Sequence, residues 1–276
     1  MQVRESFDLT NRVAVITGGA GLLGVKHAEA IAEMGGIPVL LDVNKEGLEA
    51  GVKAITSTYG VSALGLVTDI TRSTSVEKSL FKTLKTFGRV DILVNNAANN
   101  PKVEGGLKGK HWSQLENFPQ EIWEQDIAVG LTGAFLCSKI FGSEFVRRGK
   151  GVIVNVASDL ALIGPDQRIY KRPGLVDSDQ FVKPVTYSVV KSGLLGLTRY
   201  LATYWASSGV RVNAISPGGV SNKQDEDFVQ RLTNLIPMGR MAQVDEYKAA
   251  IAFLVSDASS YMTGANIVID GGRTAW

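Results

Sequence analysis

The chain has 276 residues, of which 45% are hydrophobic and 20% charged, and its formal net charge is +2. This length suits one large core. The net charge argues neither for nor against a nucleic-acid partner, but no basic cluster interleaved with aromatic residues is present, so none is expected. The single cysteine, Cys137, excludes an internal disulfide and is typical of a reducing compartment. No signal peptide or membrane-spanning apolar segment is recognised, so we expect a cytoplasmic protein without a membrane partner.

Short β-branched segments alternate with longer amphipathic ones, the pattern of repeated βαβ units around a buried parallel sheet. The strands are predicted at 13–17, 38–42, 63–69, 90–96, 151–158, 210–216 and 265–270. Helices are predicted at 22–34, 120–147 and 184–207, and two more precede the last strand. Residues 1–276 contain no repeat or linker. We therefore predict a single-domain α/β Rossmann fold, a seven-stranded parallel sheet with helices on both faces.

A glycine-rich segment, Thr17-Gly18-Gly19-Ala20-Gly21-Leu22-Leu23-Gly24, lies directly between the first predicted strand and the helix after it. Glycines in such a turn let backbone amides approach a pyrophosphate at a helix N-terminus. Asp42 ends the second strand, where a carboxylate can accept both adenosine ribose hydroxyls and repel a 2′-phosphate. The pattern predicts a dinucleotide site that prefers NAD over NADP. The pattern agrees less well with the alternative that Asp42 is only a turn residue that ends the strand.

Tyr187 and Lys191 lie four residues apart in a predicted helix, so both side chains leave the same face. A free tyrosine keeps its proton until about pH 10, and a fixed ammonium beside it favours the phenolate. Such a pair is common on ordinary helices. Its position after the strand that ends in Ser158 is what indicates a catalytic site. The alternatives are a small residue ending a buried strand for Ser158 and a solvated helix charge for Lys191.

Two connections, 99–118 and 159–183, are longer than plain strand-to-helix loops. Both begin at carboxyl ends of predicted strands, where open α/β sheets bind ligands. We therefore predict a substrate rim or lid rather than inert surface insertions. Their basic residues indicate a polar substrate, such as a sugar, a sugar acid or a phosphorylated sugar, although nearby aspartates balance much of the charge. These residues are Lys102, Lys108, Lys110, Arg168, Lys171 and Arg172.

The chain has two histidines, His27 and His111. We expect His27 on the surface of the helix at 22–34 and His111 in the first insertion, as a loop residue. Because no Cys/His cluster accompanies either of them, no protein metal site is predicted.

Taken together, these motifs resemble the short-chain dehydrogenase/reductase family from Phe7 to the C-terminus. Further matches are Asp69-Ile70, the adenine-contacting pair; Asn95-Asn96-Ala97-Ala98, the run after strand four; Pro217-Gly218, the turn after strand six; and Asp270-Gly271-Gly272, the closing strand. The resemblance implies Ser158, Tyr187 and Lys191 as catalytic residues. The predicted cofactor contacts are Gly18, Gly21, Leu22, Leu23, Asp42, Asp69, Ile70, Asn96, Ala97, Tyr187, Lys191, Pro217, Gly218 and Val220.

The resemblance implies an NAD-dependent oxidoreductase that interconverts a secondary alcohol and a ketone on a polar small molecule, assembled as a homodimer or homotetramer. Tyr187 would exchange the substrate proton, and Ser158 would donate a hydrogen bond to the substrate oxygen. Lys191 would bind the nicotinamide ribose and lower the pKa of the tyrosine. Two alternatives stay open: an epimerase or dehydratase that uses NAD as a transient hydride carrier, and an NAD-binding protein with little turnover.

Three positions depart from the family pattern. Leu22 occupies the place of the middle glycine, with Gly21 one residue early, and Asn222 stands where a threonine is frequent. Gly130 replaces an asparagine that in the family helps to hold a water chain from the lysine to solvent. The proton route must then use waters held by backbone carbonyls, or another residue of the long helix. Since glycine inside a helix costs about 1 kcal/mol relative to alanine, Gly130 indicates a need for space or a local kink.

Overall fold

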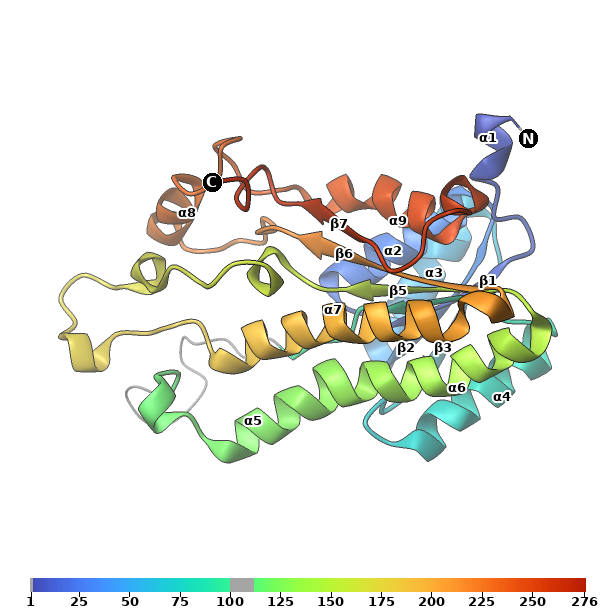
Figure 1. Ribbon diagram of the computed structural model, residues 1–276, viewed down its shortest axis with the longest axis horizontal. Helices are drawn as coiled ribbons and strands as arrows, with labels where there is room; N and C mark the ends of the chain where they lie inside the picture. The colour runs from blue at the N-terminus through green and yellow to red at the C-terminus, as the bar shows by residue number, and fades with distance from the viewer. Residues whose placement is uncertain (1, 100–111) are drawn as a thin grey trace.

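The computed structural model describes residues 2–99 and 112–276, and these residues form one sheet in the order β3-β2-β1-β4-β5-β6-β7, with every pair of neighbours parallel (Figure 1). The predicted fold of seven parallel strands is confirmed. The strands are β1 (Val13–Thr17), β2 (Ile37–Asp42), β3 (Leu64–Val67), β4 (Ile92–Asn95), β5 (Gly151–Val156), β6 (Val210–Pro217) and β7 (Asn266–Ile269).

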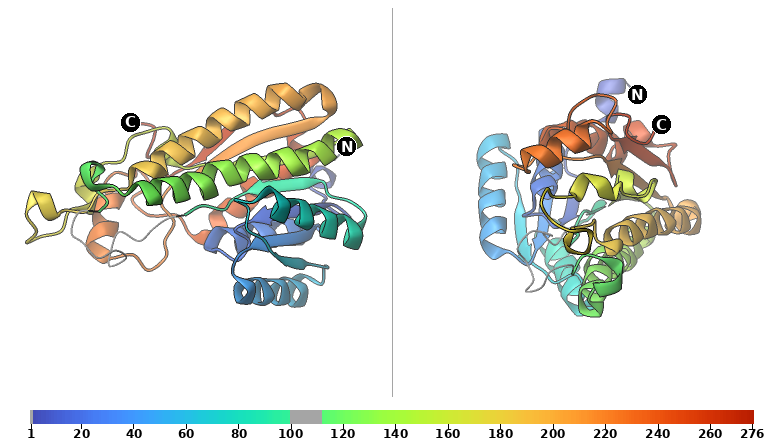
Figure 2. Two further views of the ribbon diagram at one scale, coloured as in Figure 1. Left: turned by 90° about the horizontal axis from the view of Figure 1, so that it is seen from below. Right: turned by 90° about the vertical axis from the view of Figure 1, so that its left-hand side faces the viewer.

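Helices cover both faces of the sheet (Figure 2). Successive strand residues point to opposite faces, so the uninterrupted apolar run of β1 supplies Ile16 to one core and Val15 to the other. The first core packs against α2 (Leu22–Glu33), α3 (Lys45–Tyr59) and α9 (Lys248–Val255), and the second against α4 (Ser73–Phe87), α6 (Gly133–Arg148) and α7 (Val185–Trp205). The remaining helices of the described chain are α1 (Val3–Ser6), α5 (Gln120–Ile127) and α8 (Glu226–Thr233).

Four strands end earlier than predicted, at their carboxyl ends. β3, β4, β5 and β7 stop at Val67, Asn95, Val156 and Ile269, so the polar residues predicted as strand termini lie just beyond the sheet. Ser158, for example, begins a short 3-10 turn, Asp159–Ala161. The order of the strands reverses between β1 and β4, and such a reversal opens a crevice at the carboxyl edge of a parallel sheet.

The long helix predicted at 120–147 is interrupted. Between α5 and α6 the residues Ala128–Thr132 form a π-helical turn with Gly130 at its centre. A Cβ built on Gly130 would lie 2.5 Å from Cγ1 of Val190 on α7, which is closer than two carbon atoms can pack. The predicted need for space is therefore confirmed: the glycine lets α7 pack closely against a locally irregular helix.

The continuous segment Gln120–Arg148 is long and apolar enough to cross a membrane by length and composition, with a mean hydropathy of 1.2 and half of it buried in the protein. The expectation that no apolar segment reaches that length is therefore wrong for this helix. Its apolar side chains, including Cys137, Phe141 and Phe145, form part of the second core. That packing accounts for its hydropathy.

His27 is not on the surface, as expected from the sequence, but fully buried. It shares the inward face of α2 with Gly24, Ala28 and Ile31, at the spacing of one helix face. Burial lowers the pKa of His27 to about 4, so the imidazole is neutral at pH 7.

The burial of His27 predicts a specific pH dependence of stability. The unfolded chain binds a proton near the ordinary histidine pKa of 6.5, whereas the folded chain resists it until about pH 4. The free energy of unfolding should therefore fall as the pH is lowered through this window, by up to about 3 kcal/mol. His27→Leu should remove that part of the dependence, measured by urea unfolding at several pH values. Equal slopes in the two proteins would contradict the assignment.

Candidate active site

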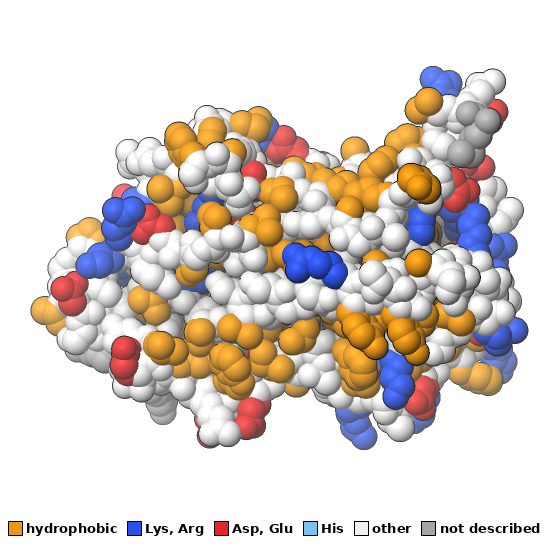
Figure 3. Space-filling model, in the orientation of Figure 1, with side chains coloured by type: hydrophobic (Ala, Val, Ile, Leu, Met, Phe, Trp, Pro, Cys, Tyr) orange, Lys and Arg blue, Asp and Glu red, His pale blue; other side chains and the backbone are white. Residues whose placement is uncertain are grey.

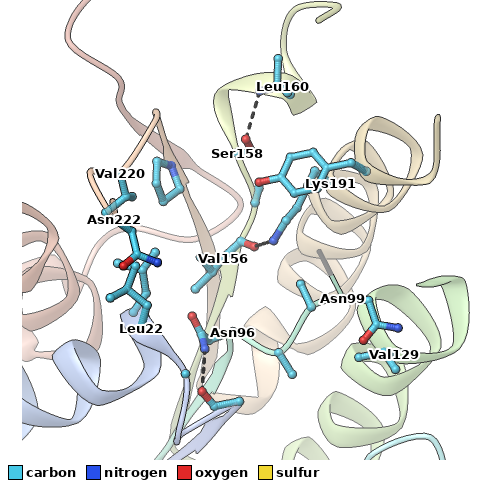
Figure 4. A pocket seen from close by; sticks show the side chains of 18 of the residues that line it. Leu22, Asn96, Asn99, Val129, Val156, Ser158, Leu160, Lys191, Val220 and Asn222 are labelled. Carbon is cyan, nitrogen blue, oxygen red and sulfur yellow. Dashed lines mark hydrogen bonds between the residues drawn. The ribbon is translucent and has the colours of Figure 1, made fainter. Parts of the chain in front are cut away.

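A cavity of about 690 Å³ runs along the carboxyl edge of the sheet, and every residue predicted to be catalytic or to bind the cofactor lines it. Figure 4 shows part of this cleft, with Ser158 and Lys191 on one side and Leu22 on the other. The turn after β1 supplies Gly18, Gly21, Leu22 and Leu23; β2 supplies Asp42; the segment after β3, Asp69 and Ile70; the segment after β4, Asn96 and Ala97; and the end of β6, Pro217, Gly218 and Val220.

Hydrogen bonds between the ends of β1 and β4 hold the crevice in shape. The Thr17 hydroxyl accepts from the backbone N–H groups of Asn96 and Ala97, at 3.0 and 3.1 Å. In return, Nδ2 of Asn96 donates to the carbonyl oxygens of Thr17 and Gly18, at 3.0 and 3.2 Å. Asn96 thus fixes the glycine-rich turn to the neighbouring strand.

The glycine-rich turn brings the chain very close to itself. A Cβ on Gly24 would lie 2.0 Å from the carbonyl oxygen of Gly18, so only glycine fits there. Gly21 is the N-cap of α2 and offers no capping side chain, which leaves the amides of the first turn available to an anion. Leu22 is 44% exposed and lies in the cleft near Val220 and Asn222 (Figure 4). The departure from the family pattern therefore places an apolar side chain at the mouth of the phosphate turn.

Two carboxylates are fixed at the predicted adenosine end. Asp42 accepts from the backbone N–H groups of Ala20 and Asn44, each at 3.0 Å, which orients the carboxylate at the end of β2. Asp69 accepts from the N–H and the hydroxyl of Thr71, at 3.0 and 2.6 Å. Both side chains reach the cleft already held in place, so ordering them on ligand binding requires little loss of conformational entropy.

The predicted catalytic residues come together at the opposite end. Lys191 is only 5% exposed, and its Nζ donates to the carbonyl oxygen of Val156 at 2.7 Å (Figure 4). The interpretation of Lys191 as a solvated helix charge is therefore wrong. The Ser158 hydroxyl accepts from the N–H of Leu160 at 3.2 Å and donates to Oδ1 of Asp159 at 2.8 Å.

Burial dominates the titration of this site. It lowers the pKa of Lys191 to about 8 and raises the pKa of Tyr187, although hydrogen bonding with Ser158 opposes the second shift. The direction for Tyr187 is opposite to the sequence expectation, because the loss of hydration outweighs the hydrogen bond with Ser158. Nζ of Lys191 lies 5.9 Å from the centre of the Tyr187 ring.

Three charged residues of the site were not predicted. Nζ of Lys183 lies 3.8 Å from the centre of the Tyr187 ring, and burial lowers the pKa of this lysine to about 8. Arg273 forms an ion pair with Asp159 at 2.7 Å, with the two side chains 7% and 4% exposed. Lys183 lies just before α7 begins, so the spacing within that helix gave no signal for it. No local signal connects Arg273 with Asp159, because the two lie 114 residues apart.

Comparison with known proteins places these features in a family. The description "short chain dehydrogenase" matches residues 12–170, and the description "Enoyl-(Acyl carrier protein) reductase" matches residues 177–274. The chain belongs to the short-chain dehydrogenase/reductase family. It is therefore an oxidoreductase that uses a nicotinamide cofactor.

Several relatives of this dehydrogenase act on polyols by name. It is 33% identical to an NAD-dependent glycerol dehydrogenase of Listeria innocua, over 98% of this chain and 96% of that protein. It is also 33% identical to an NADP-dependent mannitol dehydrogenase of Hypocrea jecorina, over 98% of this chain and 95% of that protein. A solved structure of NAD⁺-bound xylitol dehydrogenase matches with a TM-score of 0.82 at 27% identity, covering 96% of this chain and 99% of that one.

The described parts of the two insertions pack together at the open edge of the dehydrogenase. Nε2 of Gln114 lies 3.1 to 3.2 Å from three carbonyl oxygens of the second insertion, among them that of Gln180. The second insertion contains the short 3-10 turns 159–161, 167–170 and 177–179, and its Tyr170 and Lys183 line the cleft.

Arg168, Lys171 and Arg172, the described basic residues that were expected to face a polar substrate, do not line the cleft. Arg168 and Lys171 are exposed and pair with Asp166 and Asp177, away from the cavity. Arg172 does not line the cavity either and lies over the ring of Phe181. The charged groups beside Ser158 are instead Asp159, Lys183 and Arg273. His111 and the lysines of the first insertion, Lys102, Lys108 and Lys110, lie outside the described residues.

The turn after β6 is braced by a glutamine. Nε2 of Gln224 donates to the carbonyl oxygen of Val220 at 2.7 Å, and its Oε1 accepts from the N–H of Asn222 at 2.6 Å. The backbone at Val220, predicted to contact the nicotinamide amide, is thereby held in one conformation. Asn222 contributes its backbone N–H to this brace and also lines the cleft.

The contact between Gly130 and Val190 predicts opposite effects for two glycine substitutions. Gly130→Ala should destabilise the fold by roughly 1–3 kcal/mol, the usual cost of overpacking. Gly196→Ala, at an exposed position of α7 with open space around it, should instead stabilise the fold by up to about 1 kcal/mol. Urea unfolding measures both changes. Adding Val190→Ala should relieve the first. If the two single substitutions shifted stability equally, the packing argument would fail.

Proposed function

We propose that this dehydrogenase oxidises a secondary hydroxyl group of a polyol or related sugar derivative with NAD, and catalyses the reverse reduction. The observation that carries the proposal is the arrangement of Ser158, Tyr187 and Lys191 at one end of a single cleft whose other end is bounded by Asp42. A cofactor that spans this cleft has its reactive ring at the catalytic residues.

In this proposal Tyr187 takes the proton of the substrate hydroxyl during oxidation and returns it during reduction. Ser158 orients the substrate oxygen by donating a hydrogen bond to it, which requires its proton to turn from Asp159 towards the substrate. Lys191 holds the nicotinamide ribose from its buried position under Val156. NAD, when bound, accepts the hydride from the substrate carbon.

A polyol or sugar derivative agrees with the charged groups near Ser158. Asp159 can accept from a neighbouring hydroxyl, and Lys183 and Arg273 can donate to one, so hydroxyl groups on both sides of the reacting carbon find partners. The names of the glycerol, mannitol and xylitol dehydrogenases among the relatives support the same substrate class. The segment 159–183 then forms the substrate rim.

NAD as the preferred cofactor is supported by the fixed carboxylate of Asp42. Its position at the end of β2 suits two ribose hydroxyls, and the next residue, Val43, offers no positive charge to a 2′-phosphate.

We also propose a homodimer or homotetramer. Side chains of α6 and α7, among them Phe135, Val189, Tyr200 and Tyr204, form exposed apolar surface between 38% and 64% accessible. Figure 3 shows hydrophobic side chains gathered over the band where these helices lie. Such surface is typical of an interface between copies. We further propose a cytoplasmic location, which agrees with the single free cysteine, Cys137.

Substitution of the tyrosine tests the proposed function. Tyr187→Phe removes the proton carrier and little else, so turnover should fall by at least 100-fold while the dissociation constant of NADH stays nearly unchanged. The assay follows NADH absorbance with a panel of polyols and sugar acids. Tyr261→Phe, at a fully exposed tyrosine outside the cleft, serves as the control. Interconversion of substrates without net NADH would indicate the epimerase alternative, and wild-type-like turnover by Tyr187→Phe would remove Tyr187 from the mechanism.

A second substitution tests the cofactor preference. Asp42→Ala should weaken NAD binding by roughly 1.5–3 kcal/mol, the value of a hydrogen bond to a charged group, and affect NADP less. The ratio of kcat/KM with the two cofactors should therefore move towards one. Glu46→Ala, an exposed carboxylate of α3 outside the cleft, should leave the ratio as it is. Equal efficiency of the unmodified enzyme with both cofactors would refute the preference.

A further inference from the structure

A second, much smaller cavity lies behind the catalytic pair, on the side of Gly130. Its volume is about 10 Å³, and its lining includes Asp126, Gly130, Thr186, Tyr187 and Lys191. This is about the space that one water molecule needs, and the polar side chains around it are the partners that a buried water requires.

Asp126 is a carboxylate that the catalytic scheme has not used. It is 6% exposed and lies on α5, four residues before Gly130, so both residues face the same side of the helix. The Thr186 hydroxyl donates to Oδ2 of Asp126 at 2.5 Å. Thr186 directly precedes Tyr187, so this hydrogen bond ties α5 to the start of the catalytic helix. A buried carboxylate is costly to maintain, which favours a functional reason for its presence.

Gly130 alone cannot supply a proton route. It has no side chain, and the contact with Val190 leaves no room for the asparagine that the family has at this position. The carboxylate one helical turn earlier reaches the same cavity. Gly130, which lacks a polar side chain, and Asp126, which has one, therefore face the same cavity.

The charges around the cavity suit a proton carrier. Lys191 lines it from α7, and Lys183, which feels the attraction of both Asp126 and Asp159, lies over the Tyr187 ring. Arg273 is held by Asp159 on the far side of Ser158. Among the residues that line this cavity with Lys191, Asp126 is thus the carboxylate. Towards solvent, the cavity is bounded by Asn99, whose Nδ2 donates to the carbonyl oxygen of Gln125.

We propose that Asp126, oriented by Thr186, replaces the family's asparagine in the proton relay, with one water in the small cavity between it and Lys191. The proposal rests on the proposed alcohol oxidation. Because burial favours the neutral phenol, Tyr187 must first lose its own proton. Its phenolate then takes the substrate O–H proton, the O–H electron pair forms the C=O bond, and the C–H hydrogen leaves with both bond electrons as hydride to NAD. The phenolate is regenerated when a proton leaves through Lys191, the water and Asp126 to solvent, so one proton is released for each NADH formed.

Asp126→Asn tests the relay, because it keeps the shape and the acceptor for Thr186 but cannot carry a proton. We expect kcat for oxidation to fall by about tenfold or more and its pH profile to change. The solvent isotope effect on kcat should increase, since proton release becomes rate-limiting. The dissociation constant of NADH and the melting temperature should stay close to those of the unmodified enzyme. Small amine buffers should restore part of the rate by carrying the proton instead, and Asp126→Glu should retain more activity than Asp126→Asn.

Glu124→Gln is the matched control. It removes the same charge from the same helix, but Glu124 is exposed, pairs with Gln120 and does not line the cavity. It should leave the rate, the pH profile and the isotope effect as they are. Thr186→Val, which removes the hydroxyl that orients Asp126, should give a weaker version of the Asp126→Asn phenotype.

The outcomes separate the relay from the proposed function. An unmodified enzyme that binds NADH but oxidises no alcohol of the panel overturns the proposed function, and the relay with it. An active enzyme whose Asp126→Asn variant keeps its rate, pH profile and isotope effect overturns the relay alone. If the variant lost activity but neither amine buffers nor Asp126→Glu recovered any, Asp126 would be structural, and the relay would again be wrong.

Discussion

The reversal of strand order between β1 and β4 is the constraint on which the site depends. Two parallel strands whose connections leave in opposite directions cannot cover their shared carboxyl edge, so a crevice remains there. The hydrogen bonds between Thr17 and the segment after β4 fix the width of that crevice. The glycine-rich turn, the end of β2 and the end of β5 all open into it. The cleft and the proposed catalytic residues therefore share one rigid frame.

Within that frame Tyr187 and Lys191, the proposed catalytic groups, are kept away from water. Their pKa values shift in opposite directions as a result. Burial favours the neutral form of both groups, so it lowers the pKa of Lys191 and raises that of Tyr187. In the described part of the chain, the protein holds the neighbouring charges inside the site. It places Lys183 over the tyrosine ring and ties Ser158 to the buried pair of Asp159 and Arg273. Proton transfer in such a site depends on short, internal contacts rather than on bulk solvent.

The packing of α7 against the π-helical turn links structure and proton transfer. Close approach of the two helices requires glycine at position 130, because Val190 fills the space in front of it. The same packing brings Thr186 against Asp126 and leaves a cavity the size of one water beside Lys191. A side chain that is missing at one position is thus accompanied by a buried carboxylate one turn away. The packing of α7 against the π-helical turn therefore contributes to stability and also holds the groups of the proposed proton relay.

The sequence by itself predicted the parallel sheet, which the structure confirms, and it singled out the glycine-rich turn and Ser158, Tyr187 and Lys191, which the structure places along one cleft. These features follow from local patterns: the apolar run of β1, glycines between a strand and a helix, and a four-residue spacing on one helix face. The tertiary structure alone decided the role of groups that meet from distant parts of the chain, such as Arg273 with Asp159 and Asp126 with Thr186. It also decided the direction of the Tyr187 pKa shift and the burial of His27. Burial depends on every element packed around a group, so spacing along the chain cannot reveal it.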